Sequence, residues 1–328
     1  TSRLGLFGAL RVVLVVVAVI LLGGLTGGCV SEPVKIPVHG LLAEIAVGED
    51  AVWVTQQEAE GSGAAVLRID PRVNQIIASI PIEARAGTHM TVGEGAVWVT
   101  EGQRGRYVHR IDPRANQVVA AIPIPEPPGA IGAGAGTVWV AGQKGVYRID
   151  PRENRVTRSI RLPTDVILRL VVGFDAVWVA TGPGGYLFRI DPDTERVVAT
   201  IRVPSQPVTF AVLGEGSVWL VHGVFRQYES GIVTRVDPQA NEVVGESFVA
   251  GYPPHFAAGN GFLWVGRSLG PRQWTVSRLD PRTLRSVGKP ISVPSFISRI
   301  AIGFNSLWII ASLSPSTSYP SLIYRIGL

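Results

Sequence analysis

The feature that most constrains the fold is a short Trp-centred segment that recurs along the chain at an almost regular interval. One copy is the Gly-Glu-Gly-Ala-Val-Trp-Val-Thr segment of residues 93–100, in which a Gly-rich turn precedes an apolar run. Seven copies place a Trp in the same context: Trp53, Trp98, Trp139, Trp178, Trp219, Trp264 and Trp308. One large aromatic per period is better explained by seven equivalent places in a core than by seven binding sites.

A second motif, Arg-Ile-Asp-Pro or a close variant, lies between successive Trp segments. Its Pro suits the second position of a type I turn, and its Asp can accept hydrogen bonds from the backbone amides that follow. In the second period the pattern predicts strands at about 90–92, 96–100, 107–111 and 117–124. Four short strands in about 40 residues are typical of one β-propeller blade.

The two ends of the chain complete each other. The last period stops after its third strand, at residues 322–326, while residues 34–38 resemble a fourth strand that has no period of its own. Pairing these two segments closes the ring and leaves only short, protected sheet edges. The sequence therefore predicts an all-β, seven-bladed β-propeller over residues 34–328, closed by its N-terminal strand.

Residues 1–28 predict a secretory signal peptide, because they contain no acid, two bases and an apolar run at 12–22. The run ends in Leu-Thr-Gly-Gly-Cys, which resembles a bacterial lipobox and predicts lipidation of Cys29, with 29–33 as a short linker. We therefore expect the protein to be anchored on the outer face of the cytoplasmic membrane. Thr26 stands where a lipobox usually has Leu, so an uncleaved signal anchor is the alternative.

Charge and cysteine content limit the other function classes. The single cysteine excludes an intramolecular disulfide. Without residues 1–28 the chain has 28 bases (30 less Arg3 and Arg11) against 25 acids, a net charge of only +3. Nucleic-acid binding is therefore not expected, and we expect a monomer.

Function is sought where the repeats differ, because residues shared by every blade serve the scaffold. One variable position lies four residues before the conserved Gly and holds Glu44, His89, Ala130, Arg169, Phe210, His255 and Arg299. Another lies three residues after the Trp and holds Gln56, Glu101, Gly142, Thr181, His222, Arg267 and Ala311. Both sets are expected near one mouth of the central channel.

The charged members of these sets are the candidate ligand-binding residues, namely Glu44, His89, Glu101, Arg169, His222, His255, Arg267 and Arg299. Arginines suit a carboxylate or phosphate. Imidazoles can hold a divalent metal, for which His89 and His255 are the candidates. The alternative is that strand ends near solvent are simply polar and neutralise one another; no other cofactor is expected.

The longest connections between second and third strands are also candidates for binding. They are predicted at 56–64, 222–231, 268–273 and 312–321. Aromatic residues in or beside them could contact a partner or cover their own blades: Phe225, Tyr228, Trp274 and Tyr319.

The alternating Val-Trp-Val and Arg-Ile-Asp-Pro motifs of residues 34–328 resemble bacterial propellers of the YVTN (YncE-like) and streptogramin (virginiamycin B) lyase-like group. The resemblance implies the same seven-bladed ring. Its lyase branch implies metal-dependent elimination by a His/Glu/His set in which the Glu and one His are two residues apart. Glu101 follows a Trp segment as that Glu does, but its second neighbour is Gln103.

The function expected from the sequence is a membrane-anchored, extracytoplasmic binding or scaffolding module for an envelope protein or a small anionic ligand. The enzymatic alternative is a metal-dependent lyase or hydrolase that uses His89, His255 and Glu101. A purely structural envelope component is the third possibility. The chain contains no Gly-x-Ser-x-Gly, P-loop or His-Glu-x-x-His motif.

Overall fold

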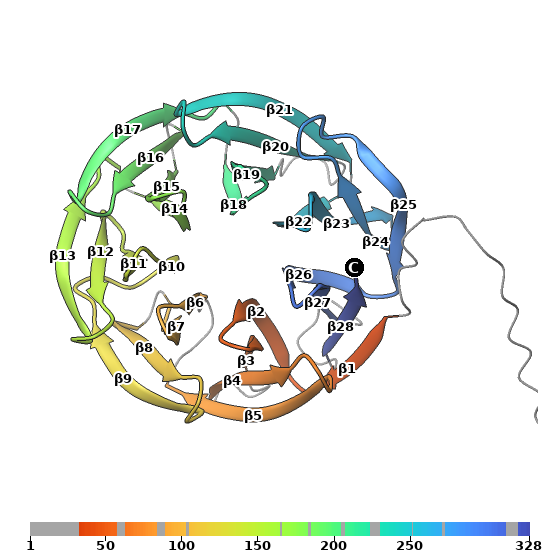
Figure 1. Ribbon diagram of the computed structural model, residues 1–328, viewed down its shortest axis with the longest axis horizontal. Helices are drawn as coiled ribbons and strands as arrows, with labels where there is room; N and C mark the ends of the chain where they lie inside the picture. Colours follow the sequence, from red (N-terminus) through yellow and green to blue (C-terminus); the bar gives the residue numbers. More distant parts are fainter. Residues whose placement is uncertain are drawn as a thin grey trace, which may run out of the picture.

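A computed structural model describes residues 33–57, 63–83, 89–102, 105–164, 166–182, 185–204, 207–223, 230–250, 252–270, 273–312 and 321–328. Its strands form seven four-stranded antiparallel sheets around a central axis (Figure 1). The predicted all-β, seven-bladed propeller is confirmed. In the part of the chain that is described, no helix is long and apolar enough to cross a membrane.

Each blade runs from an innermost to an outermost strand. The first blade contains β2 (Leu41–Gly48), β3 (Ala51–Gln57), β4 (Ala64–Asp70) and β5 (Gln75–Ile82), and the second contains β6 (Met90–Gly93), β7 (Ala96–Thr100), β8 (Tyr107–Asp112) and β9 (Gln117–Pro123). The third blade contains β10 (Ile131–Gly134), β11 (Thr137–Ala141), β12 (Gly145–Asp150) and β13 (Arg155–Arg161). The fourth contains β14 (Ile167–Gly173), β15 (Ala176–Thr181), β16 (Tyr186–Asp191) and β17 (Arg196–Arg202). The last three contain β18 (Val208–Gly214), β19 (Ser217–Gly223), β20 (Ser230–Asp237), β21 (Glu242–Ala250); β22 (Tyr252–Gly259), β23 (Phe262–Gly270), β24 (Gln273–Leu279), β25 (Ser286–Val293); β26 (Phe296–Gly303), β27 (Ser306–Ser312), β28 (Ser321–Gly327) and β1 (Val34–Val38).

The ring closes as the sequence predicts. Strand β1 is the outermost strand of the seventh blade and pairs antiparallel with β28, with Val34 opposite Arg325 and Val38 opposite Ser321. Figure 1 shows β1 beside the C-terminal blade, next to the first blade. Pro123 ends the outermost strand of the second blade and is exposed, as expected for a residue that cannot donate to a ladder.

The repeated Trp residues form the core. All seven are at most 2% exposed. In six of them the indole Nε1 donates to the carbonyl of the Gly five residues earlier, as Trp98 does to Gly93 at 3.0 Å. Trp139 Nε1 has no hydrogen-bond partner among the described residues. Each Trp is therefore buried in the core, and six of the seven also fix the turn that precedes their strand.

The repeated Arg residues join neighbouring blades. The guanidinium of Arg110 lies 5.4 Å from the ring centroid of Trp98 in its own blade, and its Nη1 donates to Asn154 Oδ1 of the next blade at 2.9 Å. Arg325 of the last blade makes the same bond to Asn74 of the first blade at 2.8 Å. The motif thus contributes to closure of the ring.

The repeated Asp residues hold the turn between the third and fourth strands. Asp112 Oδ1 accepts hydrogen bonds from the backbone amides of Arg114 and Ala115 at 2.7 and 2.9 Å. These bonds lower the pKa of Asp112 because they favour its charged form. Asn116 completes the turn with a φ of 54°, a left-handed conformation that Asn tolerates well. The predicted turn chemistry is confirmed.

Several predicted features lie outside the described residues. These are the signal peptide, Cys29 and three loop aromatics, Phe225, Tyr228 and Tyr319. Trp274 is described, and it does not offer an open surface to a partner. It is 7% exposed and packs edge-on against Phe296 of the seventh blade, with ring centroids 4.6 Å apart.

Candidate functional site

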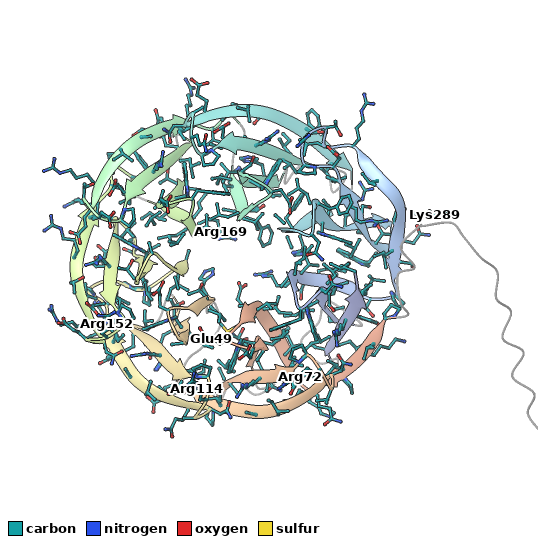
Figure 2. All side chains as sticks on the ribbon, in the orientation of Figure 1. Glu49, Arg72, Arg114, Arg152, Arg169 and Lys289 are labelled. Atoms are coloured by element: carbon teal, nitrogen blue, oxygen red, sulfur yellow. The ribbon has the colours of Figure 1, made fainter. Side chains whose placement is uncertain are left out.

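A cavity of about 220 Å³ lies where the seven innermost strands begin. Every blade contributes the residue that the repeat alignment singles out, and these seven all line it: Glu44, His89, Ala130, Arg169, Phe210, His255 and Arg299. Figure 2 shows Arg169 near the centre of the ring, whereas Arg152 and Lys289 lie at its perimeter. The first aligned set is therefore brought together as the sequence suggests.

Irregular pairing of the innermost strands positions these side chains. Register shifts interrupt the pairing of five innermost strands, between residues 42 and 45, 167 and 169, 208 and 210, 252 and 255, and 297 and 299. Such β-bulges re-aim side chains and are frequent at functional sites. Threonine hydroxyls of the second strand accept hydrogen bonds from backbone amides at this place. The Glu44 amide donates to Thr55 Oγ1 at 2.9 Å, and the His89 amide donates to Thr100 Oγ1 at 3.0 Å.

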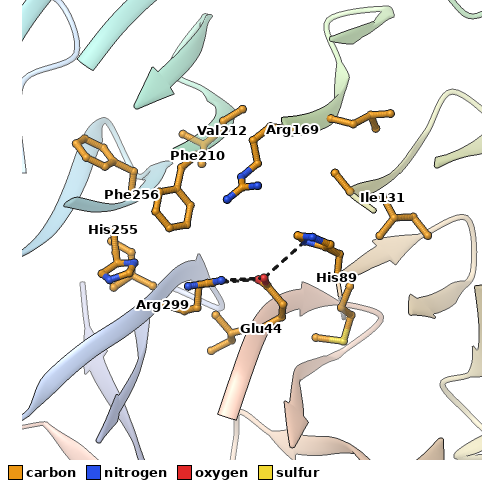
Figure 3. A pocket seen from close by; sticks show the side chains of 15 residues that line it. Glu44, His89, Ile131, Arg169, Phe210, Val212, His255, Phe256 and Arg299 are labelled. Carbon is orange, nitrogen blue, oxygen red and sulfur yellow. Dashed lines mark hydrogen bonds and ion pairs between the residues drawn. The ribbon is translucent and has the colours of Figure 1, made fainter. Parts of the chain in front are cut away.

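Glu44 and Arg299 form a bidentate ion pair in the pocket. Arg299 Nε and Nη2 donate to the two carboxylate oxygens of Glu44 at 3.2 and 3.0 Å. His89 Nδ1 lies 3.7 Å from Glu44 Oε1 on the other side (Figure 3). The pair links residues 255 positions apart in sequence, which only ring closure brings together.

Arg169 has no such partner. Its Nη1 donates to the carbonyl of Leu168 at 2.6 Å, and its guanidinium lies 5.5 Å from the ring centroid of Phe210. No carboxylate of the described residues is within ion-pair distance of it. Burial lowers the pKa of Arg169, Glu44 opposes this shift and Arg299 adds to it. An arginine nevertheless stays charged in proteins.

The two histidines of the pocket are neutral at pH 7. Burial and, to a smaller extent, the charge of Arg299 lower the pKa of His255 to about 3, and only the Ile297 backbone opposes this. Burial also lowers the pKa of His89, against the influence of Glu44. The pocket thus holds two guanidinium groups and one carboxylate, an excess of one positive charge. This charge balance suits an anion.

The second aligned set is not brought into this pocket. Glu101 accepts hydrogen bonds from the backbone amides of Arg106 and Tyr107 at 2.8 and 3.2 Å and lies 3.0 Å from His109 Nε2. All three partners belong to the connection and third strand of its own blade. Glu101 therefore does not line the pocket with His89 and His255.

His222 and Arg267 also contact the third strand of their own blades. His222 Nε2 lies 2.9 Å from Thr234 Oγ1, which in turn donates to Glu246 Oε1 at 2.7 Å. Burial lowers the pKa of His222 to about 4. Arg267 Nη2 donates to Ser277 Oγ at 3.3 Å. No residue of the second set lines this pocket, and Glu101, His222 and Arg267 instead contact the third strand of their own blades.

The pocket does not suit a metal ion. Among the described residues, no group of three or more His, Cys, Asp and Glu is arranged to hold one. His89, His255 and Glu44 line the pocket together, but the Glu44 carboxylate is engaged by Arg299. Two guanidinium groups at the same place oppose a cation. Metal binding by His89 and His255 stays a prediction.

Sequence reasoning overlooked Phe210 as a functional residue, although it stands in the aligned set. Arg169 and Arg299 both lie against its ring, at 5.5 and 5.3 Å from the centroid, and His255 packs edge-on to it at 5.4 Å. The signal was present, since Phe is the one aromatic at a variable and mostly polar position.

Comparisons with known proteins show the fold alone. No model of a protein family matches the chain, and no curated protein matches it. Among solved structures, U3-55K is 10% identical, with a TM-score of 0.68 over 90% of this chain and 98% of that one. BamB from Moraxella catarrhalis is 12% identical, with a TM-score of 0.59 over 88% and 86%. The WD40 domain of Neurospora crassa Pan2 is 12% identical, with a TM-score of 0.65 over 87% and 89%.

At these identities the resemblance to YVTN and streptogramin-lyase-like propellers stays a prediction.

Proposed function

We propose that this protein is a binding module that holds a small anion in the pocket at the centre of its propeller. A rigid ring of seven sheets fits a binding or scaffolding role. The observation that carries the proposal is Arg169, a partly buried guanidinium that points into the pocket and pairs with no carboxylate of the described residues (Figure 3).

Most of the N–H groups of the Arg169 guanidinium are available to a ligand. A guanidinium carries five N–H groups in a fixed fork that matches a carboxylate or phosphate, and the structure assigns one of its hydrogen bonds to the Leu168 carbonyl. A buried charge without a partner is costly, so an anion at this place stabilises the folded protein. The cavity of about 220 Å³ is smaller than the ~300–1,000 Å³ typical of drug-sized ligands. A small carboxylate or phosphate therefore fits better than a polymer.

Binding is favoured over catalysis. The lyase or hydrolase alternative needs His89, His255 and Glu101 around one substrate. Glu101 is engaged by its own blade and does not line the pocket. Among the residues that the structure describes, the only carboxylate that lines the pocket is Glu44, which is held by Arg299.

Thermal denaturation of the purified full chain with acetate, succinate, phosphate and sulfate tests the proposal. A ligand at 100 times its Kd adds about 2.7 kcal/mol of stability, which is easily measured. We expect Arg169→Gln to weaken binding at least ~10-fold, which corresponds to ~1.4 kcal/mol, and the exposed Arg161→Gln to leave it unchanged. Equal binding by wild type and Arg169→Gln, or no binding of any anion, contradicts the proposal.

We also propose that the protein is exported and anchored in the membrane through a lipid on Cys29. The support is the sequence alone, an apolar run at 12–22 followed by the lipobox-like residues 25–29. Incorporation of a labelled fatty acid into the wild type and its loss in Cys29→Ser tests this. Label that persists in Cys29→Ser refutes lipidation at this residue.

A further inference from the structure

The Glu44 carboxylate already occupies the place where an external anion would meet Arg299. It receives two parallel hydrogen bonds from Arg299, at 3.0 and 3.2 Å. This is the bidentate geometry in which arginine recognises carboxylate and phosphate ligands. His89 approaches the same carboxylate from the second blade, with Nδ1 3.7 Å from Oε1.

Glu44 can leave this place without a change of fold. Its backbone is fixed, because its amide donates to Thr55 Oγ1 at 2.9 Å. Its side chain is 20% exposed and lines the cavity. Rotation about its side-chain torsions, between staggered states of similar energy, is enough to move the carboxylate toward solvent.

Departure of Glu44 leaves two guanidinium groups without a carboxylate partner beside the same aromatic ring; among the described residues, each keeps only a hydrogen bond to a neighbouring backbone carbonyl. Arg169 on β14 and Arg299 on β26 lie against the same Phe210 ring, with guanidinium carbons 5.5 and 5.3 Å from its centroid. The other titratable groups of the pocket, His89 and His255, are neutral at pH 7. Two positive charges in a partly desolvated site attract two negative charges more strongly than one.

We propose that the ligand of this pocket is a small dianion that bridges Arg169 and Arg299 and displaces Glu44 from Arg299. This inference rests on the proposed anion-binding function and specifies the ligand class. Glu44 is then a built-in competitor that selects by charge. A monoanion binds Arg169 and leaves the Glu44–Arg299 pair intact, whereas a dianion takes both arginines.

Isothermal titration of the full chain with sulfate and with acetate, at pH 7.5 and constant ionic strength, tests the inference. Sulfate is a dianion and acetate a monoanion at this pH. Glu44→Gln keeps the shape of the side chain but removes the competing charge. We expect it to bind sulfate at least ~10-fold more tightly than wild type, while acetate affinity changes less than ~3-fold. Glu44→Asp keeps the charge on a shorter side chain, and its sulfate affinity is expected to lie between those of the wild type and Glu44→Gln.

Unchanged or weaker sulfate binding by Glu44→Gln overturns the inference. If acetate still binds in a manner that depends on Arg169, the proposed function stands without it; if neither anion binds either protein, both fail. Arg299→Lys tests the same point should Glu44→Gln not fold, because it keeps the charge and loses the fork. It is expected to lose at least ~10-fold in sulfate affinity and to keep acetate affinity. Equal losses for both anions contradict the inference.

Succinate separates the two chemical kinds of dianion. A dicarboxylate spreads its charges over two groups, and sulfate concentrates them on one. If Glu44→Gln raises the affinity for both sulfate and succinate, the pocket selects by charge, as proposed. Enhancement of neither refutes it.

Discussion

A serine at the start of the second strand should stabilise those blades that have alanine there. In the fifth blade this residue is Ser217, whose Oγ accepts a hydrogen bond from Arg235 Nε at 2.9 Å. In the seventh blade it is Ser306, whose Oγ accepts one from Arg325 Nε, also at 2.9 Å. In the first, second and fourth blades it is alanine, and the Nε atom of the equivalent arginine is buried with no hydrogen-bond partner in the described part of the chain: Ala51 with Arg68, Ala96 with Arg110 and Ala176 with Arg189.

Ala96→Ser tests this account. Ala96 is 0% exposed, so an added hydroxyl has no water to bind, and we expect it to accept from Arg110 Nε as the two serines do from their arginines. An unsatisfied buried donor costs ~1–3 kcal/mol, and part of that is recovered when the bond forms, so we expect a gain of about 1 kcal/mol. The three equivalent substitutions share no partner and should add to about 3 kcal/mol.

The geometry of the hydroxyl decides the result. Thr137 of the third blade carries a hydroxyl at this position but donates it to the Gly134 carbonyl at 3.3 Å, and Arg148 Nε stays unpaired. Serine lacks the methyl group that restricts the threonine rotamer, and for this reason it is the substitution to make.

Urea unfolding, extrapolated linearly to water, measures the change. Ala311→Ser is the matched control, because Ala311 is equally buried in the apolar core between the sixth and seventh blades. It should destabilise the protein by ~1–3 kcal/mol, as expected for a hydroxyl buried without a partner. A loss for Ala96→Ser as large as that for Ala311→Ser refutes the reasoning.

Three further predictions follow from the contacts described above. Asn74→Gly keeps the left-handed turn and removes one of the two acceptors of Arg325 Nη1, leaving the Pro71 carbonyl. Urea unfolding should therefore show a loss of about 1 kcal/mol; no loss would mean that the bond to Asn74 does not contribute to closure. Burial holds the pKa of His222 at about 4, below its unfolded value of 6.5, so the unfolded state binds more protons between these values. The unfolding free energy should therefore fall as pH drops from 6.5 to 4, by on the order of 3 kcal/mol from this residue, and His222→Gln should flatten the profile; an equally steep profile in the variant contradicts this. Phe210→Leu should weaken anion binding less than ~10-fold, since it keeps both arginine charges and removes only the ring on which they pack; a titration that shows complete loss contradicts this role.

The sequence predicts the fold in detail because the same pattern of strands and turns recurs in every repeat. Trp98 and its six counterparts fix the period, and the second-blade strands 90–93, 96–100, 107–112 and 117–123 follow from apolar alternation and turn residues. Alignment of the repeats also finds the pocket. The position of Glu44 in one innermost strand is the position of Arg299 in another, so a ring brings them to one place.

The rest depends on side-chain direction, which periodicity does not give. Glu101 and His222 follow their Trp by three residues and were predicted at the channel mouth, but both contact the third strand of their own blade. The β-bulges that aim Arg169 and Arg299 leave no mark in the sequence. The contact between Arg299 and Glu44 likewise depends on closure, which sets the last blade beside the first.

The central claim is that this pocket binds a small anion through Arg169. Crystals of the protein soaked in selenate, with anomalous diffraction measured at the selenium edge, test it most directly. The account predicts an anomalous peak between Arg169 and Arg299, with the Glu44 carboxylate turned away from Arg299. An empty pocket, with selenate found only beside exposed surface arginines, would contradict it.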